Sequence, residues 1–327
     1  MTATGARTRT STETNTDLVG TDNDPTTADA GGSRLERSPR HPRGSRNGHG
    51  HRSWSLGGIA LQMPFWVFSA AIAIIFLYPL VWTAVSSVAP RAGTNQVNGW
   101  GLGNYITLVN YQDGIWQYIA NSTIVSLLTV LLTLFISLLG GYAFARFSFR
   151  GKNTLFLATI AILMVPYATL LIPLYVLLNQ VGLSNSLVGV ALVLTMFQLP
   201  FSTFMMRISF ESVPRELDEA AMVDGCTSWS VLWRVLVPAV KPGLITVGLF
   251  AFLAAWNDFM APLILINDSS RITLPLAISN LRGQVQGVVD YGATEAGVVV
   301  LALPCILLFL ILQRHYVRGF MSGAFKG

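Results

Sequence analysis

The clearest pattern in the chain is a series of long apolar stretches separated by short polar segments. No Asp, Glu, Lys or Arg occurs in residues 53–90, 114–145 or 153–206. Each of these stretches is longer than the roughly 20 apolar residues that a helix needs to cross a bilayer. Helices in the core of soluble proteins rarely run so far without a charge, so the pattern predicts an integral membrane protein.

The apolar stretches predict an all-α, polytopic membrane protein with six transmembrane helices. The stretch 153–206 is long enough for two helices, and it divides near Asn179-Gln180 and at the Gly, Ser and Asn residues of 182–186. Because such residues favour turns, this segment predicts a tight external hairpin. The six predicted spans are residues 63–88, 118–142, 155–178, 187–206, 243–266 and 294–313.

Residues 1–53 have a different composition from the rest of the chain. They are rich in small and polar residues and hold eight Arg against six acidic residues. A segment so poor in large apolar side chains cannot bury enough surface to offset its ordering entropy, which predicts a disordered cytoplasmic tail. A nucleic-acid-binding arm is the weaker alternative, because the excess of positive charge is small. The predicted organisation is therefore this tail followed by a six-helix membrane domain, residues 54–327.

Composition agrees with a membrane protein and gives no sign of enzyme chemistry. Hydrophobic residues make up 52% of the chain and charged residues 11%, whereas about a quarter of a soluble globular chain is charged. The two cysteines, Cys226 and Cys305, lie in different kinds of segment, so they predict neither a disulfide framework nor paired metal ligands. We expect no catalytic residue, no metal site and no cofactor in this chain.

The distribution of basic residues predicts the orientation of the protein. Cytoplasmic segments of membrane proteins carry an excess of Lys and Arg. With both termini inside, eighteen of the 21 Lys and Arg residues lie in cytoplasmic segments, and only Arg91, Arg271 and Arg282 lie outside. We therefore expect a multi-pass protein of the cell (plasma or inner) membrane with both termini in the cytoplasm.

The longest polar interruption, about residues 207–242, lies between the fourth and fifth predicted spans and predicts a helix–turn–helix. Pro214 suits the first turn of a helix, where its missing N–H is not needed, and acidic residues follow it near the positive end of the helix dipole. Gly225 is a natural stop, because glycine tolerates a left-handed backbone. A second short helix is expected to begin with Ser228 as its N-cap and to end before Pro238.

This polar segment resembles the cytoplasmic "EAA" loop of bacterial binding-protein-dependent ABC permeases, and we call residues 207–242 the EAA loop. The family pattern is Glu-Ala-Ala, a Gly four residues later, and a Pro about a dozen residues beyond that Gly. The chain matches at each position, and the resemblance implies that the loop couples the membrane domain to an ATPase rather than only bridging two spans. The implied coupling residues are Glu219, Ala220, Ala221, Asp224, Gly225 and Pro238.

Other segments are similar to the sugar-importing branch of that family, and most similar to the second membrane subunit of maltose-type importers. They include Met164-Val165-Pro166, Ile172-Pro173-Leu174-Tyr175, Trp256-Asn257-Asp258-Phe259 with Pro262, Gln313-Arg314, Gly319 and the C-terminal Gly323-Ala324-Phe325-Lys326-Gly327. The resemblance implies the fold of a type I ABC importer permease, and a C-terminal tail in which Gly323 and Lys326 contact the ATPase. It also implies these partners: a homologous second permease subunit, two ATPase subunits that bind the ATP and Mg²⁺, an extracytoplasmic solute-binding protein and a sugar.

Asp258 is the one carboxylate well inside an apolar span. A charge near the middle of a bilayer costs roughly 2.5–3.5 kcal/mol on insertion scales, so Asp258 is expected to face a water-filled cavity or a polar partner. Two roles stay open. Together with Asn257 it lines the solute path, or it makes a structural hydrogen bond to another helix.

Three alternative functions remain at the level of the sequence. The sugar assignment rests on resemblance alone, so an ABC permease for another solute is open. A secondary transporter powered by an ion gradient would be expected to carry buried ionisable pairs and repeated halves with interrupted helices, and the chain shows one intramembrane carboxylate and no evident duplication. A membrane-embedded enzyme would need a nucleophile–base pair or a metal site. The sequence also has no phosphate-binding Gly-rich loop, so ATP hydrolysis is expected on another chain.

Overall fold

The computed structural model describes residues 56–90, 99–281 and 290–324. The predicted tail, residues 1–53, lies outside the described residues. The chain divides into two units, residues 1–60 and 61–327, and the second is described below. The helices are α1 (Leu56–Val88), α2 (Gly103–Val109), α3 (Ile115–Arg146), α4 (Lys152–Ala161), η1 (Ile162–Met164), α5 (Tyr167–Gln180), α6 (Leu187–Glu211), α7 (Glu216–Val223), α8 (Ser228–Val231), η2 (Leu232–Leu236), α9 (Val237–Ala239), α10 (Lys241–Asn257), α11 (Met260–Leu265), η3 (Ser269–Arg271), α12 (Leu274–Leu281) and α13 (Tyr291–Ala324).

Among the described residues, four helices are long and apolar enough to cross a bilayer without a break: residues 63–88 of α1, the helices α3 and α6, and residues 291–313 of α13. Two further pairs of helices pass the same test but are sharply bent. The pair 152–164 and 167–180 bends by 103°, and the pair 228–239 and 241–257 bends by 77°. Counting each bent pair as one span gives six among the described residues, as many as the sequence predicts. In the second pair only 241–257 overlaps a predicted span, because 228–239 belongs to the EAA loop.

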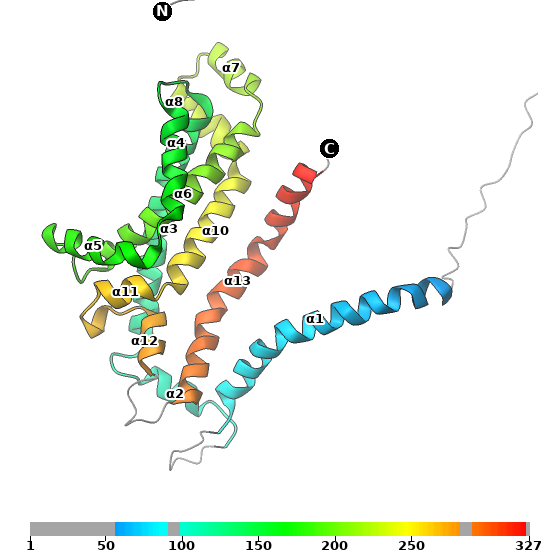
Figure 1. Ribbon diagram of the computed structural model, residues 1–327, viewed down its shortest axis with the longest axis vertical. Coiled ribbons are helices and arrows are strands. Elements are labelled where there is room, and N and C mark those ends of the chain that lie inside the picture. The colour runs from blue at the N-terminus through cyan, green and yellow to red at the C-terminus, as the bar shows by residue number, and fades with distance from the viewer. Residues whose placement is uncertain (1–55, 91–98, 282–289, 325–327) are drawn as a thin grey trace, which may run out of the picture. The chain divides into compact units, whose positions relative to one another are not determined.

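The third predicted span, 155–178, is not one continuous helix, which corrects the prediction. It breaks between η1 and α5, where Val165 takes an extended backbone (φ −81°, ψ 126°) and Pro166 is extended as well. The cause is local, because proline disfavours the helical conformation in the residue before it. Figure 1 shows the chain turning sharply between α4 and α5.

The fifth predicted span, 243–266, is also interrupted. Helix α10 ends at Asn257, and Asp258 takes an extended conformation (φ −71°, ψ 130°). Its Oδ1 atom then accepts a hydrogen bond from the Ala261 N–H at 2.8 Å, so the carboxylate caps the short helix α11. In the described residues, the third predicted span is therefore broken at Pro166 and the fifth at Asp258, whereas the 77° bend lies before the fifth span, between Ala239 and Lys241.

Helices α3 and α6 form the most extensive helix pair, and small side chains allow them to approach. A row of small polar residues is buried along one face of α3: Ser126, Thr129, Thr133 and Ser137. The row continues at Gly141, where a Cβ atom would lie 2.5 Å from Met206 Cβ of α6. Close contact through small residues is the usual way in which membrane helices pack, because lipid provides no hydrophobic drive for association.

The segment between the last two spans is built into the fold rather than being a simple surface loop. Six of the eight residues of α12 are buried. The Asn121 side chain of α3 donates hydrogen bonds to the Ser270 and Ile272 carbonyls, both at 2.9 Å. The Leu274 N–H donates to Ser122 Oγ at 2.8 Å. These bonds fix α12 to the first turns of α3.

Candidate functional site

The first helix of the EAA loop is α7. Its first turn carries Glu216, Asp218 and Glu219, which favour the positive end of the helix dipole. The helix begins two residues after Pro214 rather than at it. It ends as predicted at Gly225, whose φ of 84° is left-handed. The Gly225 N–H donates to the Met222 carbonyl and the Cys226 N–H donates to the Ala221 carbonyl, both at 3.0 Å. This pair of bonds is a Schellman motif.

The second helix of the EAA loop differs from the prediction in two ways. Its N-cap is Thr227, whose side chain accepts a hydrogen bond from the Ser230 N–H, and Ser228 is the first helical residue. The helix also continues past Pro238. The π-helical turn η2 ends at Leu236, so Pro238 falls in the first turn of α9, where a missing N–H disrupts nothing.

An ion pair fixes the inner face of α7 to the end of α3. The Arg146 Nε atom lies 2.8 Å from Asp218 Oδ2. The same guanidinium donates to the Val213 carbonyl at 2.9 Å, and Arg215 donates to the Ala145 carbonyl at 3.4 Å. Charge-assisted bonds of this kind are stronger than neutral ones, so α7 is held in a defined position against the membrane helices.

The electrostatics of this ion pair are governed by burial. Desolvation raises the pKa of the Asp218 carboxyl above its ordinary value, while the Arg146 and Arg215 guanidinium groups act to lower it. Around the pair lies an apolar cluster that joins the EAA loop to α3, α6 and α10, with these buried members: Leu138, Tyr142, Ala145, Met206, Phe210, Val213, Val231, Leu232, Leu236, Val240 and Val247.

The outer face of the EAA loop carries the residues that the sequence singles out. Ala221 is half-buried, and the other five are exposed: Glu219, Ala220, Asp224, Gly225 and Pro238. Large apolar side chains are exposed beside them, namely Leu217, Met222, Val223, Trp229 and Trp233. An acidic and apolar surface with a rigidly anchored inner face is suited to docking another protein. Figure 1 shows α7 and α8 beyond the end of α6.

A second feature lies where the two interrupted spans meet. A pocket of about 460 Å³ opens there, and we call it the broken-helix pocket. Its lining residues are Ile162, Leu163, Met164, Val165, Pro166, Tyr167, Leu194, Phe197, Gln198, Ala254 and Asp258. The Tyr167 hydroxyl donates to Asp258 Oδ2 at 2.8 Å, so one hydrogen bond links the start of α5 to the break after α10.

The structure places Asp258 and Asn257 differently. Asp258 makes structural hydrogen bonds to Tyr167 and Ala261 and also lines the broken-helix pocket, so the two roles left open by the sequence are compatible. The Asn257 amide instead donates to the Leu253 carbonyl at 2.8 Å and approaches Cys305 Sγ of α13 at 3.6 Å. A role of either residue in the solute path stays a prediction.

Sequence reasoning did not single out Arg146, Asp218, Tyr167 or Gln198. Arg146 carried a signal, because it is the first charge after a long apolar span and therefore stands where a surface loop begins. Tyr167 carried another, because it directly follows the helix-breaking Pro166. Gln198 is one of the few long polar side chains within the charge-free stretch 153–206. The partner of each side chain depends on the tertiary fold, which spacing along the chain does not reveal.

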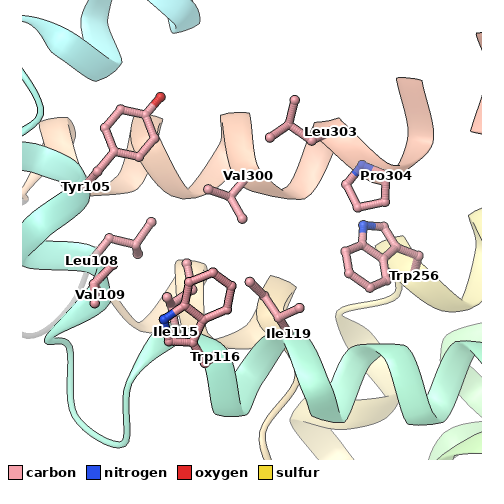
Figure 2. A pocket seen from close by; sticks show the side chains of 10 residues that line it. All are labelled: Tyr105, Leu108, Val109, Ile115, Trp116, Ile119, Trp256, Val300, Leu303 and Pro304. Atoms are coloured by element: carbon pink, nitrogen blue, oxygen red, sulfur yellow. The ribbon is translucent and has the colours of Figure 1, made fainter. Parts of the chain in front are cut away.

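A further pocket, of about 390 Å³, lies between α13 and the segments α2, α3 and α10 (Figure 2). Figure 2 shows Val300, Leu303 and Pro304 of α13 on one side, with Trp256 facing Pro304. Its lining is apolar, and its one hydroxyl, that of Tyr105, is bonded to Ser87 at 2.9 Å. The Trp256 indole N–H donates to the Leu301 carbonyl at 2.9 Å, so apart from the Trp116 indole N–H the pocket offers a polar solute few binding groups.

The predicted tail contact falls at the limit of the described chain. Gly323 belongs to the last turn of α13, which ends at Ala324, and Lys326 lies outside the described residues. In the part of the chain that the structure describes, no three His, Cys, Asp or Glu side chains gather as metal ligands would.

Comparison with known proteins adds to these observations. Residues 134–321 match the family model described as "Binding-protein-dependent transport system inner membrane component". The chain is 34% identical over 281 residues to the probable ABC transporter permease protein YurM of Bacillus subtilis, covering 84% of this chain and 91% of that protein. It is 32% identical to the diacetylchitobiose uptake system permease protein DasC of Streptomyces coelicolor, covering 80% and 96%.

The fold matches a solved structure as well. A chain from the crystal structure of a bacterial ABC transporter involved in the import of the acidic polysaccharide alginate aligns with a TM-score of 0.67 and 21% identity. The alignment covers 80% of this chain and 98% of that chain. At this identity the match establishes the fold.

Proposed function

The chain belongs to the family of binding-protein-dependent transport system inner membrane components, and we propose that it is a membrane-spanning permease subunit of an ATP-driven ABC importer for a sugar or oligosaccharide. The observation that carries this proposal is the EAA loop. Its outer face is exposed and its inner face is fixed to α3 by the Arg146–Asp218 ion pair. A movement applied to the loop is therefore passed to the membrane helices.

The sugar part of the proposal is supported by the names of several relatives. Permeases for diacetylchitobiose in Streptomyces coelicolor, for arabinooligosaccharides in Halalkalibacterium halodurans and for trehalose in Mycobacterium tuberculosis are 30–32% identical to this chain. All three names denote saccharides. Which saccharide the importer takes up is determined by the binding protein and by the solute path.

The importer also needs other chains. The proposed partners are a second, homologous permease subunit, two ATPase subunits docked on the EAA loops and an extracytoplasmic binding protein. This chain is not the ATPase, because its sequence has no phosphate-binding loop, so ATP and Mg²⁺ are bound by the partner. ATP binding there shifts the permease between two conformations, which gives alternating access to the solute.

The orientation in the cell membrane follows from the basic residues. Both termini and the EAA loop lie in the cytoplasm, where the ATPase is available, and the α5–α6 turn lies outside. The C-terminal tail, with Gly323 and Lys326, is then on the ATPase side and contacts it.

Affinity purification from membranes of the native host tests the assembly. The tagged chain should retain an ATPase, a second permease and, with crosslinking, a binding protein. Glu219→Lys reverses a charge on the exposed face of α7 and should release the ATPase, and a chain ending at residue 322 should weaken its retention. Asp113→Lys makes the same charge change far from the EAA loop and should retain the ATPase. Purification without any ATPase, together with uptake that depends on an ion gradient, would favour a secondary transporter.

A further inference from the structure

The broken-helix pocket has the size and composition of a ligand site. Its volume of about 460 Å³ falls in the range of roughly 300–1,000 Å³ that is usual for small-molecule pockets. Most of its lining is apolar, and its polar side chains are Gln198, Tyr167 and Asp258. A largely apolar wall with a few placed polar groups is the common pattern of such sites.

The Asp258 carboxylate is held in one orientation at this pocket. Its Oδ1 atom accepts from the Ala261 N–H and its Oδ2 atom accepts from the Tyr167 hydroxyl, each at 2.8 Å. Two donors on the two oxygens suit the ionised form, because an ionised carboxylate only accepts hydrogen bonds. Each oxygen keeps a further lone pair, which can accept from a hydroxyl or ammonium group in the pocket.

Gln198 supplies a second polar group, and its hydrogen-bonding capacity is not satisfied within the part of the chain that the structure describes. It is half-buried on α6, and its amide makes no hydrogen bond to another residue that the structure describes. A primary amide in an apolar span is costly unless it finds partners, so this amide is served by water or by a solute. Sugar hydroxyls both donate and accept, and an amide does the same.

The aromatic rings provide the apolar side of the site. Tyr167 and Phe197 meet edge to face with ring centres 4.6 Å apart, and both line the pocket. Rings locked in this arrangement form a firm apolar wall that can cover the C–H face of a pyranose while the polar groups hold its hydroxyls.

The formal charge of the pocket lining is of one sign, and it is negative. Its lining holds one carboxylate and no Lys, Arg or His. A carboxylate or sulfonate on the solute would meet like charge at Asp258, whose partial burial leaves the repulsion less screened than at an exposed site. A hydroxyl or an ammonium group would instead be attracted.

Resting on the proposed function, we propose that the broken-helix pocket is a solute-binding site on the translocation path through this subunit. It binds uncharged or amino saccharides and repels acidic ones. Gln198 and Asp258 bind the hydroxyls, and Asp258 supplies the discrimination by charge.

Charged thiol reagents test the pocket in the complete importer reconstituted in nanodiscs. Cys226 and Cys305 are changed to Ala, and Leu194→Cys places one thiol in the pocket wall. The rate of reaction is measured with a methanethiosulfonate that carries a trimethylammonium group and with one that carries a sulfonate group. Each rate is divided by the rate at which the same reagent reacts with a free thiol in solution. The cationic reagent should react faster, and Asp258→Asn should lower the ratio by roughly tenfold, the size expected for one nearby charge.

A second variant keeps the test decisive if Asp258→Asn disturbs assembly. Gln198→Glu adds a carboxylate and should raise the preference for the cationic reagent. Maltotriose and a glucosamine trimer should slow labelling of Leu194→Cys, whereas trigalacturonate should not. Equal rates for the two reagents, slowing by trigalacturonate, or slowing by no saccharide would each overturn the proposal. ATP-driven saccharide uptake by the same importer is measured separately, so the proposed function can stand while this inference fails.

Discussion

The Arg146 guanidinium at the end of α3 and the Asp218 carboxylate of α7 form a buried ion pair, with Nε 2.8 Å from Oδ2 and the side chains 8% and 11% exposed. Glu219, the residue that follows Asp218 in α7, is exposed. The ion pair therefore joins α7, on whose exposed face an ATPase would dock, to α3, a helix long and apolar enough to cross a membrane. This contact makes the EAA loop a rigid extension of α3 rather than a flexible bridge.

A double-mutant cycle tests the mechanical role of this pair. Arg146→Met or Asp218→Leu alone leaves a buried charge without its partner, at a cost of about 3 kcal/mol, so amide hydrogen exchange in α7 should accelerate about a hundredfold. The double variant leaves no unpaired charge and should recover most of the protection, because desolvation already makes the pair costly. If the single variants exchange like the wild type, the ion pair does not hold α7.

Gly225 is expected to be needed because its backbone conformation is left-handed, and not because a side chain there would collide with a neighbour. Its φ is 84°, and no atom lies within 4 Å of where a Cβ would stand, so Gly225→Val costs about 1–2 kcal/mol through backbone strain. The variant should insert into the membrane but lose the ATPase on purification. Gly151→Val is a matched control, because Gly151 has φ 83° and equally open surroundings outside the loop. Equal loss of the ATPase by both variants would remove the special role of the Gly225 turn.

The α3–α6 contact predicts a sharp difference between two glycines. A methyl group at Gly141 would lie 2.5 Å from Met206 Cβ and 2.9 Å from its carbonyl carbon, so Gly141→Ala should destabilise the protein by about 1–3 kcal/mol through overpacking. At Gly248 the nearest atom, Leu134 Cδ1, is 3.5 Å away, and Gly248→Ala should be tolerated. Thermal aggregation in detergent compares the two variants, and equal midpoints would contradict this account of the packing.

Several elements of the fold could be predicted from the sequence because their causes are local. The lengths of the apolar stretches gave six spans, and Gly225 marked the end of α7. The two interrupted spans were missed because the expected helices were drawn through Pro166 and Asp258. For Pro166 the information was local, since proline acts on the residue before it. For Asp258 the information was not local, because an aspartate in an apolar run can cap a helix, bond to a residue on another helix or face a cavity.

The candidate site was predictable in part for the same reason. The residues of the EAA loop stand close together in the chain, so a family pattern could identify them. The groups of the broken-helix pocket come from η1, α5, α6 and α10, and Tyr167 and Asp258 are 91 positions apart. Their association depends on how the helices pack, which no spacing along the sequence reveals.

The orientation predicts which engineered thiols are accessible from outside the cell. Single cysteines at Gly182, in the turn between α5 and α6, and at Gly283 should react with an impermeant thiol reagent added to intact cells. A cysteine at Gly151, between α3 and α4, should react only after the cells are opened. Labelling of the Gly151 position alone in intact cells would reverse the orientation.

ATP-driven uptake by the reconstituted importer tests the account most directly. Proteoliposomes carrying this chain, its partner permease and the ATPase, supplied with the binding protein, should accumulate a radiolabelled neutral oligosaccharide only when ATP is present. Importer carrying Glu219→Lys should fall to the level without ATP, while Asp113→Lys should match the wild type. Uptake that does not need ATP, or full ATP-driven uptake by the Glu219→Lys importer, would contradict the assignment of this chain as a permease subunit coupled through its EAA loop.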